Sequence, residues 1–260
     1  MSGAEQTKDK RARQGADAVA AARTGGGGSR MVIAGIAIIV LLAVVVGGAL
    51  FLQHRNQPQK LGVSIPVAAA GPQYPVTVQG DTIVTGSPQA PVTIDIYEDF
   101  LCPHCGQFEH TYHPRLAQAA ADGKAKVIYH PVAILDSRSI PAGYSTLAAG
   151  ATFCAAEAGI FPRFHDSLFA SQPTEGDPAW TTAQLQQLGA TLGAGPGFAN
   201  CVQAGADQRI ATATDNASKY ISGLRADHMF GTPTVLVNGA VVEDAAEGQW
   251  LDQALSGAHR

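Results

Sequence analysis

The sequence is poor in cysteine and in charged residues, and it lacks several motifs that would indicate common functions. Four of its 260 residues are cysteine, and Asp, Glu, Lys and Arg together make up 15% of the chain. It has no glycine-rich phosphate loop, no internal repeat and no basic stripe suited to nucleic acid. These absences argue against a P-loop enzyme, a solenoid and a nucleic-acid-binding protein. A length of 260 residues predicts one globular domain plus an appendage, and 46% hydrophobic residues are enough for a packed core.

The few charges are unevenly distributed, and a long apolar run separates the two charged regions. Residues 1–30 hold six basic and three acidic residues, a net charge of +3, whereas residues 53–260 hold eleven basic and eighteen acidic ones, a net charge of −7. Residues 31–52 contain no charged side chain. A helix rises about 1.5 Å per residue, so this run would reach about 33 Å and could cross a hydrocarbon core of about 30 Å.

A cleaved signal peptide is the alternative to a membrane anchor. Its apolar region is usually about 7–15 residues long and precedes a small-residue cleavage site. The run here is longer and ends in Phe51-Leu52-Gln53 without such a site. We therefore expect an uncleaved single-pass anchor at residues 31–52. Because its basic flank is N-terminal, the positive-inside rule predicts that residues 1–30 are cytoplasmic and that everything after the anchor is extracytoplasmic. Residues 1–30 contain almost no large apolar side chains and are expected to be a disordered tail.

The part after the anchor predicts a linker followed by an α/β domain. Residues 53–75 are rich in Pro, Gly, Gln and Ala and predict a linker, so the domain is expected at 76–260. Hydrophobic spacing and turn signals predict the order β-βα-β, a helical insert, α, β-β and α. The corresponding segments are strands within 76–84, 92–97 and 127–129, the insert at about 141–205, a helix at 207–224, a hairpin at 235–242 with an Asn238-Gly239 turn, and a terminal helix containing Trp250.

Two of the four cysteines form the motif Cys102-Pro103-His104-Cys105, directly after a predicted strand. A zinc site would need two further ligands, and the nearby His110 and His113 would lie on the following helix, with no second C-x-x-C in the chain. Haem attachment requires a histidine where Gly106 stands. A purely structural bridge would close almost no loop and would stabilise the fold little. The motif therefore favours a redox-active pair.

The position of Cys102 predicts a reactive thiolate. It would lie at the first turn of a helix, where unsatisfied N–H groups and the macrodipole stabilise an anion and thiol pKa values fall to about 3.5–7.5. Pro103 suits the start of a helix, and a protonated His104 would add a positive charge. Stabilising the thiolate stabilises the reduced form and makes the disulfide a stronger oxidant. We expect Cys102 to be the exposed nucleophile and Cys105 its partner.

A second segment, Gly231-Thr232-Pro233, precedes the predicted hairpin. Proline at the start of a strand usually marks an edge or a turn. Next to a redox motif, a cis Thr232–Pro233 bond would instead place backbone groups against the cysteines, where they would pair with an extended substrate.

Together, the run from Asp99 to Cys105, the helical stretch and the segment Gly231–Gly239 resemble the DsbA-like branch of the thioredoxin superfamily, and more closely its membrane-tethered actinobacterial members. The resemblance implies a thioredoxin fold with an inserted helical domain and a cis-proline loop packed over the active-site disulfide. It also implies a buried acid beneath the cysteines. Asp95, Glu98 and Asp99 are the candidates, and we prefer Asp95, on the central strand.

The other two cysteines, Cys154 and Cys201, fall on apolar faces of the helical stretch. Two buried free thiols are the alternative to a disulfide. In an oxidising extracytoplasmic compartment we expect a structural disulfide, which by the chain-entropy model would contribute about 4 kcal/mol. The family resemblance implies the same pairing.

These features predict a thiol–disulfide oxidoreductase that donates disulfides to exported proteins and uses neither a bound cofactor nor a metal. By resemblance, a DsbB-type or vitamin K epoxide reductase-like quinone enzyme in the membrane would reoxidise it. A reductase or isomerase of the same fold and a non-catalytic tethered module that holds client segments are the alternatives. The remaining histidines, His113 and His165 among them, have no evident partner in the sequence and are assigned ordinary surface or core roles.

Overall fold

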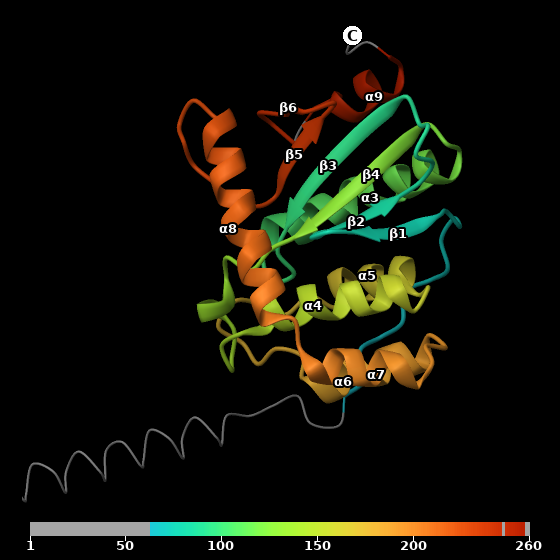
Figure 1. The fold of residues 1–260 in the computed structure, drawn as a ribbon, viewed down its shortest axis with the longest axis vertical. Helices are drawn as coiled ribbons and strands as arrows, with labels where there is room; N and C mark the ends of the chain where they lie inside the picture. Colours follow the sequence, from blue (N-terminus) through green and yellow to red (C-terminus); the bar gives the residue numbers. More distant parts are fainter. Residues whose placement is uncertain (1–62, 246–247, 258–260) are drawn as a thin grey trace, which may run out of the picture. The chain divides into compact units, whose positions relative to one another are not determined.

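The computed structural model describes residues 63–245 and 248–257, which form one six-stranded sheet and the helices around it (Figure 1). The order of the strands is β1-β2-β4-β3-β5-β6, and β3 and β4 run parallel while the other neighbours are antiparallel. The strands are β1 (Val76–Gln79), β2 (Thr82–Thr85), β3 (Val92–Glu98), β4 (Ala125–Pro131), β5 (Thr234–Val237) and β6 (Ala240–Val241).

Helices cover both faces of this sheet and form a separate layer beside it (Figure 1). Within the described residues they are α3 (Pro103–Ala121), the short 3-10 helix η1 (Asp136–Arg138), α4 (Tyr144–Glu157), α5 (Phe161–Ala170), α6 (Thr182–Thr191), α7 (Pro196–Ala204), α8 (Asp207–Leu224) and α9 (Trp250–Leu255). The helices α4 to α7 all lie between β4 and α8 in the chain, so the predicted helical insert is confirmed.

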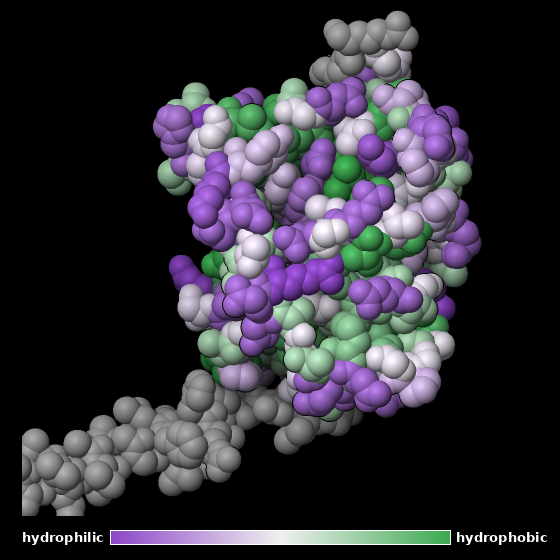
Figure 2. Space-filling model, viewed as in Figure 1, coloured by the Kyte–Doolittle hydropathy of each residue, from purple (hydrophilic) through white to green (hydrophobic). Residues whose placement is uncertain are grey.

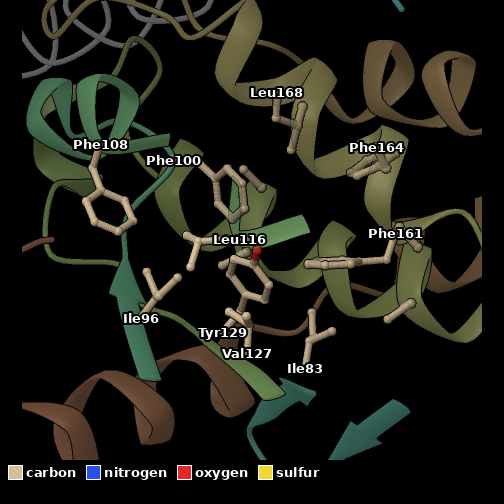
Figure 3. Close-up of a cluster of buried hydrophobic side chains, with 14 of the residues drawn as sticks. Ile83, Ile96, Phe100, Phe108, Leu116, Val127, Tyr129, Phe161, Phe164 and Leu168 are labelled. Carbon is tan, nitrogen blue, oxygen red and sulfur yellow. The ribbon is translucent and has the colours of Figure 1, made fainter. Parts of the chain in front are cut away.

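The alternation of side chains along β3 divides the core between the two faces of the sheet. Ile94 and Ile96 point into the main core, which α3 and the insert complete, whereas Tyr97 packs with Ile221 of α8 in a smaller cluster on the opposite face. Figure 3 shows Ile96 beside aromatic residues of the main core. Each large side chain that is fully buried in this way contributes about 1.5–3 kcal/mol.

Local sequence signals explain several boundaries of these elements. A capping box between Thr181 and Gln184 starts α6, as its sequence predicts. Asn238 and Gly239 both have positive φ, 51° and 84°, which the turn between β5 and β6 requires. The predicted hairpin is therefore confirmed, and α9 confirms the predicted terminal helix.

Part of the predicted linker packs against the insert. Ile65 is buried, the Ala68 N–H donates to the Ser167 hydroxyl at 2.9 Å, and Gln184 Nε2 donates to the Val63 carbonyl at 2.7 Å. Residues 63–75 are therefore packed against the domain.

The predicted tail and membrane anchor, residues 1–52, lie outside the described residues. Among the helices that the structure does describe, none is both long and apolar enough to span a bilayer. On the face shown in Figure 2, hydrophilic and apolar side chains are interspersed, as is usual for a globular domain.

Candidate active site

The C-x-x-C motif forms the junction between β3 and α3. Cys102 is the N-cap of α3, with extended backbone angles (φ −71°, ψ 117°), and Pro103 is the first helical residue. This arrangement suits proline, which lacks an N–H and has a fixed φ. Both cysteines are free thiols here. Cys102 is only 6% exposed and Cys105 is fully buried, so the predicted nucleophile is more enclosed than the sequence suggested.

The loop before β5 completes the site, although it is far from Cys102 in the sequence. The Thr232–Pro233 peptide bond is cis, and the Cys102 thiol donates a hydrogen bond to the Thr232 carbonyl oxygen at 3.2 Å. Gly231 accepts a hydrogen bond from the Thr234 hydroxyl at 2.7 Å, which closes the loop locally. The structure therefore brings together the two segments that the sequence singled out.

The two thiols have opposite electrostatic environments. The pKa of Cys102 is lowered to about 5, chiefly by a hydrogen bond from the Cys105 thiol and further by the Thr232 side chain and by the backbone N–H groups of His104 and Cys105, against the opposing effect of burial. The pKa of Cys105 is raised well above its usual value, mainly by burial and then by its proximity to Cys102. At neutral pH the reduced pair is therefore a thiolate at Cys102 and a thiol at Cys105.

A cavity of about 210 Å³ adjoins this junction. Its walls come from the start of α3, the cis-proline loop and the segment after β6, and they include His104, Phe108, Thr232, Pro233 and Val242. The His104 side chain is exposed and lines this cavity. The backbone N–H of His104 faces the thiolate while its ring faces the space where a substrate would lie.

The preference for Asp95 as the buried acid is wrong. Its side chain is 19% exposed, and it pairs with His130 at 2.9 Å on the sheet face that α8 covers. Strand alternation is the reason, because Asp95 points away from the face that carries Ile94 and Ile96. The two fully buried acids of this region are Glu98 and Asp99.

Asp99 organises the loop that carries Cys102. Its Oδ1 accepts hydrogen bonds from the Leu101 N–H (2.9 Å) and the Ser145 hydroxyl (2.7 Å), and its Oδ2 accepts from the N–H groups of Ile134 (2.8 Å) and Leu135 (3.0 Å). Burial raises the pKa of Asp99, and these hydrogen bonds oppose the rise. Its own backbone N–H faces Cys105 Sγ at 3.5 Å. Asp99 is thus a positioning residue for the redox pair.

Glu98 belongs to a different group of buried polar residues. Its Oε1 lies 2.9 Å from His165 Nε2 on α5, and both side chains are 1% exposed. Burial raises the pKa of Glu98 to about 7, with the coulombic effect of His165 opposing it. The sequence offered no signal for this pair, since the partners are 67 positions apart.

The remaining cysteine pair lies in the helical insert. Cys154 on α4 and Cys201 on α7 form a disulfide with Cα atoms 5.9 Å apart. It ties two helices of the insert together and is separate from the redox pair.

The C-x-x-C at a strand-to-helix junction, with a cis-proline loop over it, lies within residues 78–256, which match the family model described as thioredoxin. The chain belongs to the thioredoxin family. Among solved structures, this thioredoxin-family chain is similar to DsbA from Mycobacterium tuberculosis in its reduced form (29% identity, TM-score 0.54), covering 69% of this chain and 100% of that one. It is also similar to the thiol–disulfide oxidoreductase MdbA from Corynebacterium matruchotii (24% identity, TM-score 0.62), over 71% and 92% of the two chains.

A curated relative extends the comparison. The chain is 36% identical over 181 residues to the serine/threonine-protein kinase PknE of Mycobacterium tuberculosis, a match that covers 67% of this chain and 31% of that protein. The thioredoxin-family chain thus spans about a third of the length of this relative. Its own domain has the fold of the DsbA-like thiol–disulfide oxidoreductases, and the resemblance expected from the sequence is confirmed.

Proposed function

We propose that this chain donates disulfides to exported proteins through its Cys102–Cys105 pair. The observation that carries the proposal is the asymmetry between the two thiols, with the pKa of Cys102 lowered to about 5 and that of Cys105 raised. A stabilised thiolate favours the reduced enzyme, so the enzyme disulfide is readily transferred to a substrate. The same thiolate is a good leaving group, which speeds the resolution of a mixed disulfide.

The reaction consists of two exchanges. A substrate thiolate attacks Cys102 Sγ of the oxidised pair, a substrate–Cys102 disulfide forms, the Cys102–Cys105 bond breaks, and Cys105 takes up a proton. A second substrate thiolate then attacks the substrate sulfur of the mixed disulfide, and Cys102 leaves as the thiolate. The substrate loses two electrons and the enzyme gains them.

The surroundings of the cysteines suit an unfolded polypeptide. The cavity beside His104 and the cis-proline loop is open to an extended segment, whose backbone would pair with the loop at Thr232. Two exposed apolar side chains precede this loop, Leu224 at 45% and Met229 at 66% exposure. Exposed apolar side chains are typical of surfaces that hold segments of other proteins.

The sequence supports an extracytoplasmic location for this chemistry. The uncharged run at residues 31–52, with its basic N-terminal flank, supports a single-pass anchor that leaves the cysteines outside the membrane, where disulfides persist. Continued turnover then requires a membrane oxidant that accepts two electrons from the reduced pair. We propose a quinone-linked enzyme of the DsbB or vitamin K epoxide reductase-like type.

The reduction potential of the full-length chain against glutathione tests the direction of transfer. A donor is expected between about −120 and −180 mV, whereas a value near −270 mV, as in thioredoxin, would make the chain a reductase.

Cys102→Ala separates an enzyme from a binding module. We expect this variant to lose all oxidation of a reduced client, and a variant that still promotes client refolding as well as the wild type would overturn the enzymatic proposal.

A further inference from the structure

A cluster of buried histidines and carboxylates lies between α3 and α5, away from the cis-proline loop. We call it the α3–α5 cluster; it consists of Glu98, Glu109, His113, His165 and Asp166. His165 is fully buried, Glu98 is 1% exposed and Glu109 is 4% exposed. The proposed disulfide exchange makes no use of these groups, and hydrophobic packing does not explain why they meet.

Several atoms of the cluster are buried without a hydrogen-bond partner. They are Oε2 of Glu98, both carboxylate oxygens of Glu109, Nδ1 of His165 and Oδ1 of Asp166. Buried polar atoms are nearly always satisfied in folded proteins, and an unsatisfied group carries the full cost of its lost hydration. A cation held among these atoms would satisfy their lone pairs.

The ligand geometry is close to that of a metal site. One ligand atom each from Glu109, His113 and His165 lies within 4.8 Å of the other two. Glu109 Oε2 is 2.9 Å from His113 Nδ1 and 4.0 Å from His165 Nδ1. Tetrahedral zinc with bonds of about 2.0–2.1 Å places its ligand atoms about 3.3 Å apart, so small side-chain movements suffice. The Tyr129 hydroxyl makes only a long contact, 3.4 Å, with the same His113 nitrogen.

The second nitrogen of each histidine already faces a carboxylate. His165 Nε2 lies 2.9 Å from Glu98 Oε1, and a proton held on Nε2 would leave the Nδ1 lone pair available to a cation in the cluster. His113 Nε2 lies 2.8 Å from Asp166 Oδ1. Carboxylates in this position orient histidines that bind metals and raise their basicity.

We propose that the α3–α5 cluster binds one divalent transition-metal ion, zinc foremost. The ligands are a Glu109 oxygen and the Nδ1 atoms of His113 and His165, and Glu98 and Asp166 orient the two rings. Imidazole and carboxylate ligands suit Zn²⁺. The fourth position faces a cavity of about 280 Å³, lined by Gly106, Glu109, His113 and Asp166 among others, through which the ion and a water molecule enter. The metal would join the helix that carries the redox motif to the helical insert.

Zinc binding by the full-length protein tests this proposal. The protein is first oxidised so that Cys102 and Cys105 form a disulfide and cannot bind metal. It is then dialysed against Zn²⁺, desalted and analysed by mass spectrometry for metal content. We expect about one zinc per chain in the wild type, and at least tenfold weaker binding in Glu109→Gln and in His113→Gln. His110→Gln is the matched control, because His110 lies on the same helix and lines the same cavity.

X-ray absorption at the zinc edge gives an independent measurement that needs no variant. A shell of nitrogen and oxygen scatterers with the signature of two imidazoles is expected, and a sulfur scatterer would overturn the assignment. A wild type that retains no zinc would show that the cluster is an ion-pair network, and zinc retained equally by all three variants would place the metal elsewhere. Failure of the proposed disulfide donation would leave all these results unchanged.

Discussion

Cys102 and Thr232 are 130 positions apart in the chain, yet the Cys102 thiol donates a hydrogen bond to the Thr232 carbonyl oxygen across 3.2 Å. When Cys102 ionises, this donor is lost, and the thiolate instead accepts hydrogen bonds from the Cys105 thiol, the Thr232 side chain and the N–H groups of the first helical turn. The contact therefore changes with the protonation state of the nucleophile, and several measurable properties of the domain depend on it.

The pH dependence of Cys102 alkylation should report its lowered pKa. We expect the rate of carbamidomethylation of the reduced protein by iodoacetamide to rise with an apparent pKa near 5, because the thiolate is the reactive form. Cys105→Ala removes the hydrogen bond that lowers the pKa of Cys102 most and should shift the midpoint upward. An unchanged midpoint in that variant would contradict the assigned cause.

The stability of the reduced form should also depend on pH. The pKa of Cys102 is lowered from an ordinary value of 9.0 to about 5 on folding. A lowered pKa contributes stability that is complete above the unfolded value and is lost as the pH falls through the folded value. The free energy of unfolding of the reduced protein, minus that of the oxidised protein, should therefore decrease as the pH is lowered from 9 to 5. Urea unfolding of both forms measures this difference. A difference that increases as the pH is lowered from 9 to 5 would contradict the prediction.

Replacing Asp99 should destabilise the domain strongly. Its side chain accepts four hydrogen bonds in a buried site, and hydrogen bonds to charged groups contribute about 1.5–3 kcal/mol each in mutational data. We expect Asp99→Ala to lower the free energy of unfolding by about 3 kcal/mol or more. Asp95→Ala is the matched control, because its side chain is 19% exposed and makes one ion pair with His130 in place of four buried hydrogen bonds, so its loss should cost less. Equal losses in the two variants would contradict this account.

Removing the second disulfide should lower stability without changing the nucleophile. Cys154 and Cys201 are 47 residues apart, and the chain-entropy model gives about 4 kcal/mol for a loop of this length. We expect the Cys154→Ala/Cys201→Ala variant to lose about 2–5 kcal/mol of unfolding free energy and to retain the alkylation midpoint of Cys102. A shift of that midpoint would show that the insert and the redox pair are coupled through this bridge.

The sequence predicted what depends on local pattern. The strand before Cys102, the capping box at Thr181 and the Asn238-Gly239 turn are signals carried by a few neighbouring residues, and the structure confirms the elements that they predict. The proximity of Thr232 to Cys102 is a contact across the domain; a proline at the start of a strand made it one of two interpretations, and the family resemblance favoured it.

The sequence does not show which face of a strand each helix covers, so the surroundings of the side chains on that strand could not be predicted. Asp95, Glu98 and Asp99 are nearly adjacent in the chain, but they lie in three different environments, and only the packing of α5 and α8 on opposite faces distinguishes them. The α3–α5 cluster was missed for the same reason. His165 comes from the insert and meets β3 and α3 only after the chain has folded back.

The hydrogen bond from Ser145 to Asp99 has a consequence for engineering. Ser145 is the second residue of α4, so the first helix of the insert holds the loop that positions the nucleophile. A chimera that receives a new insert from a relative would therefore inherit a new support for its redox loop. Grafts that keep a hydroxyl at position 145 should preserve the reactivity of Cys102, whereas grafts that lose it should alter that reactivity.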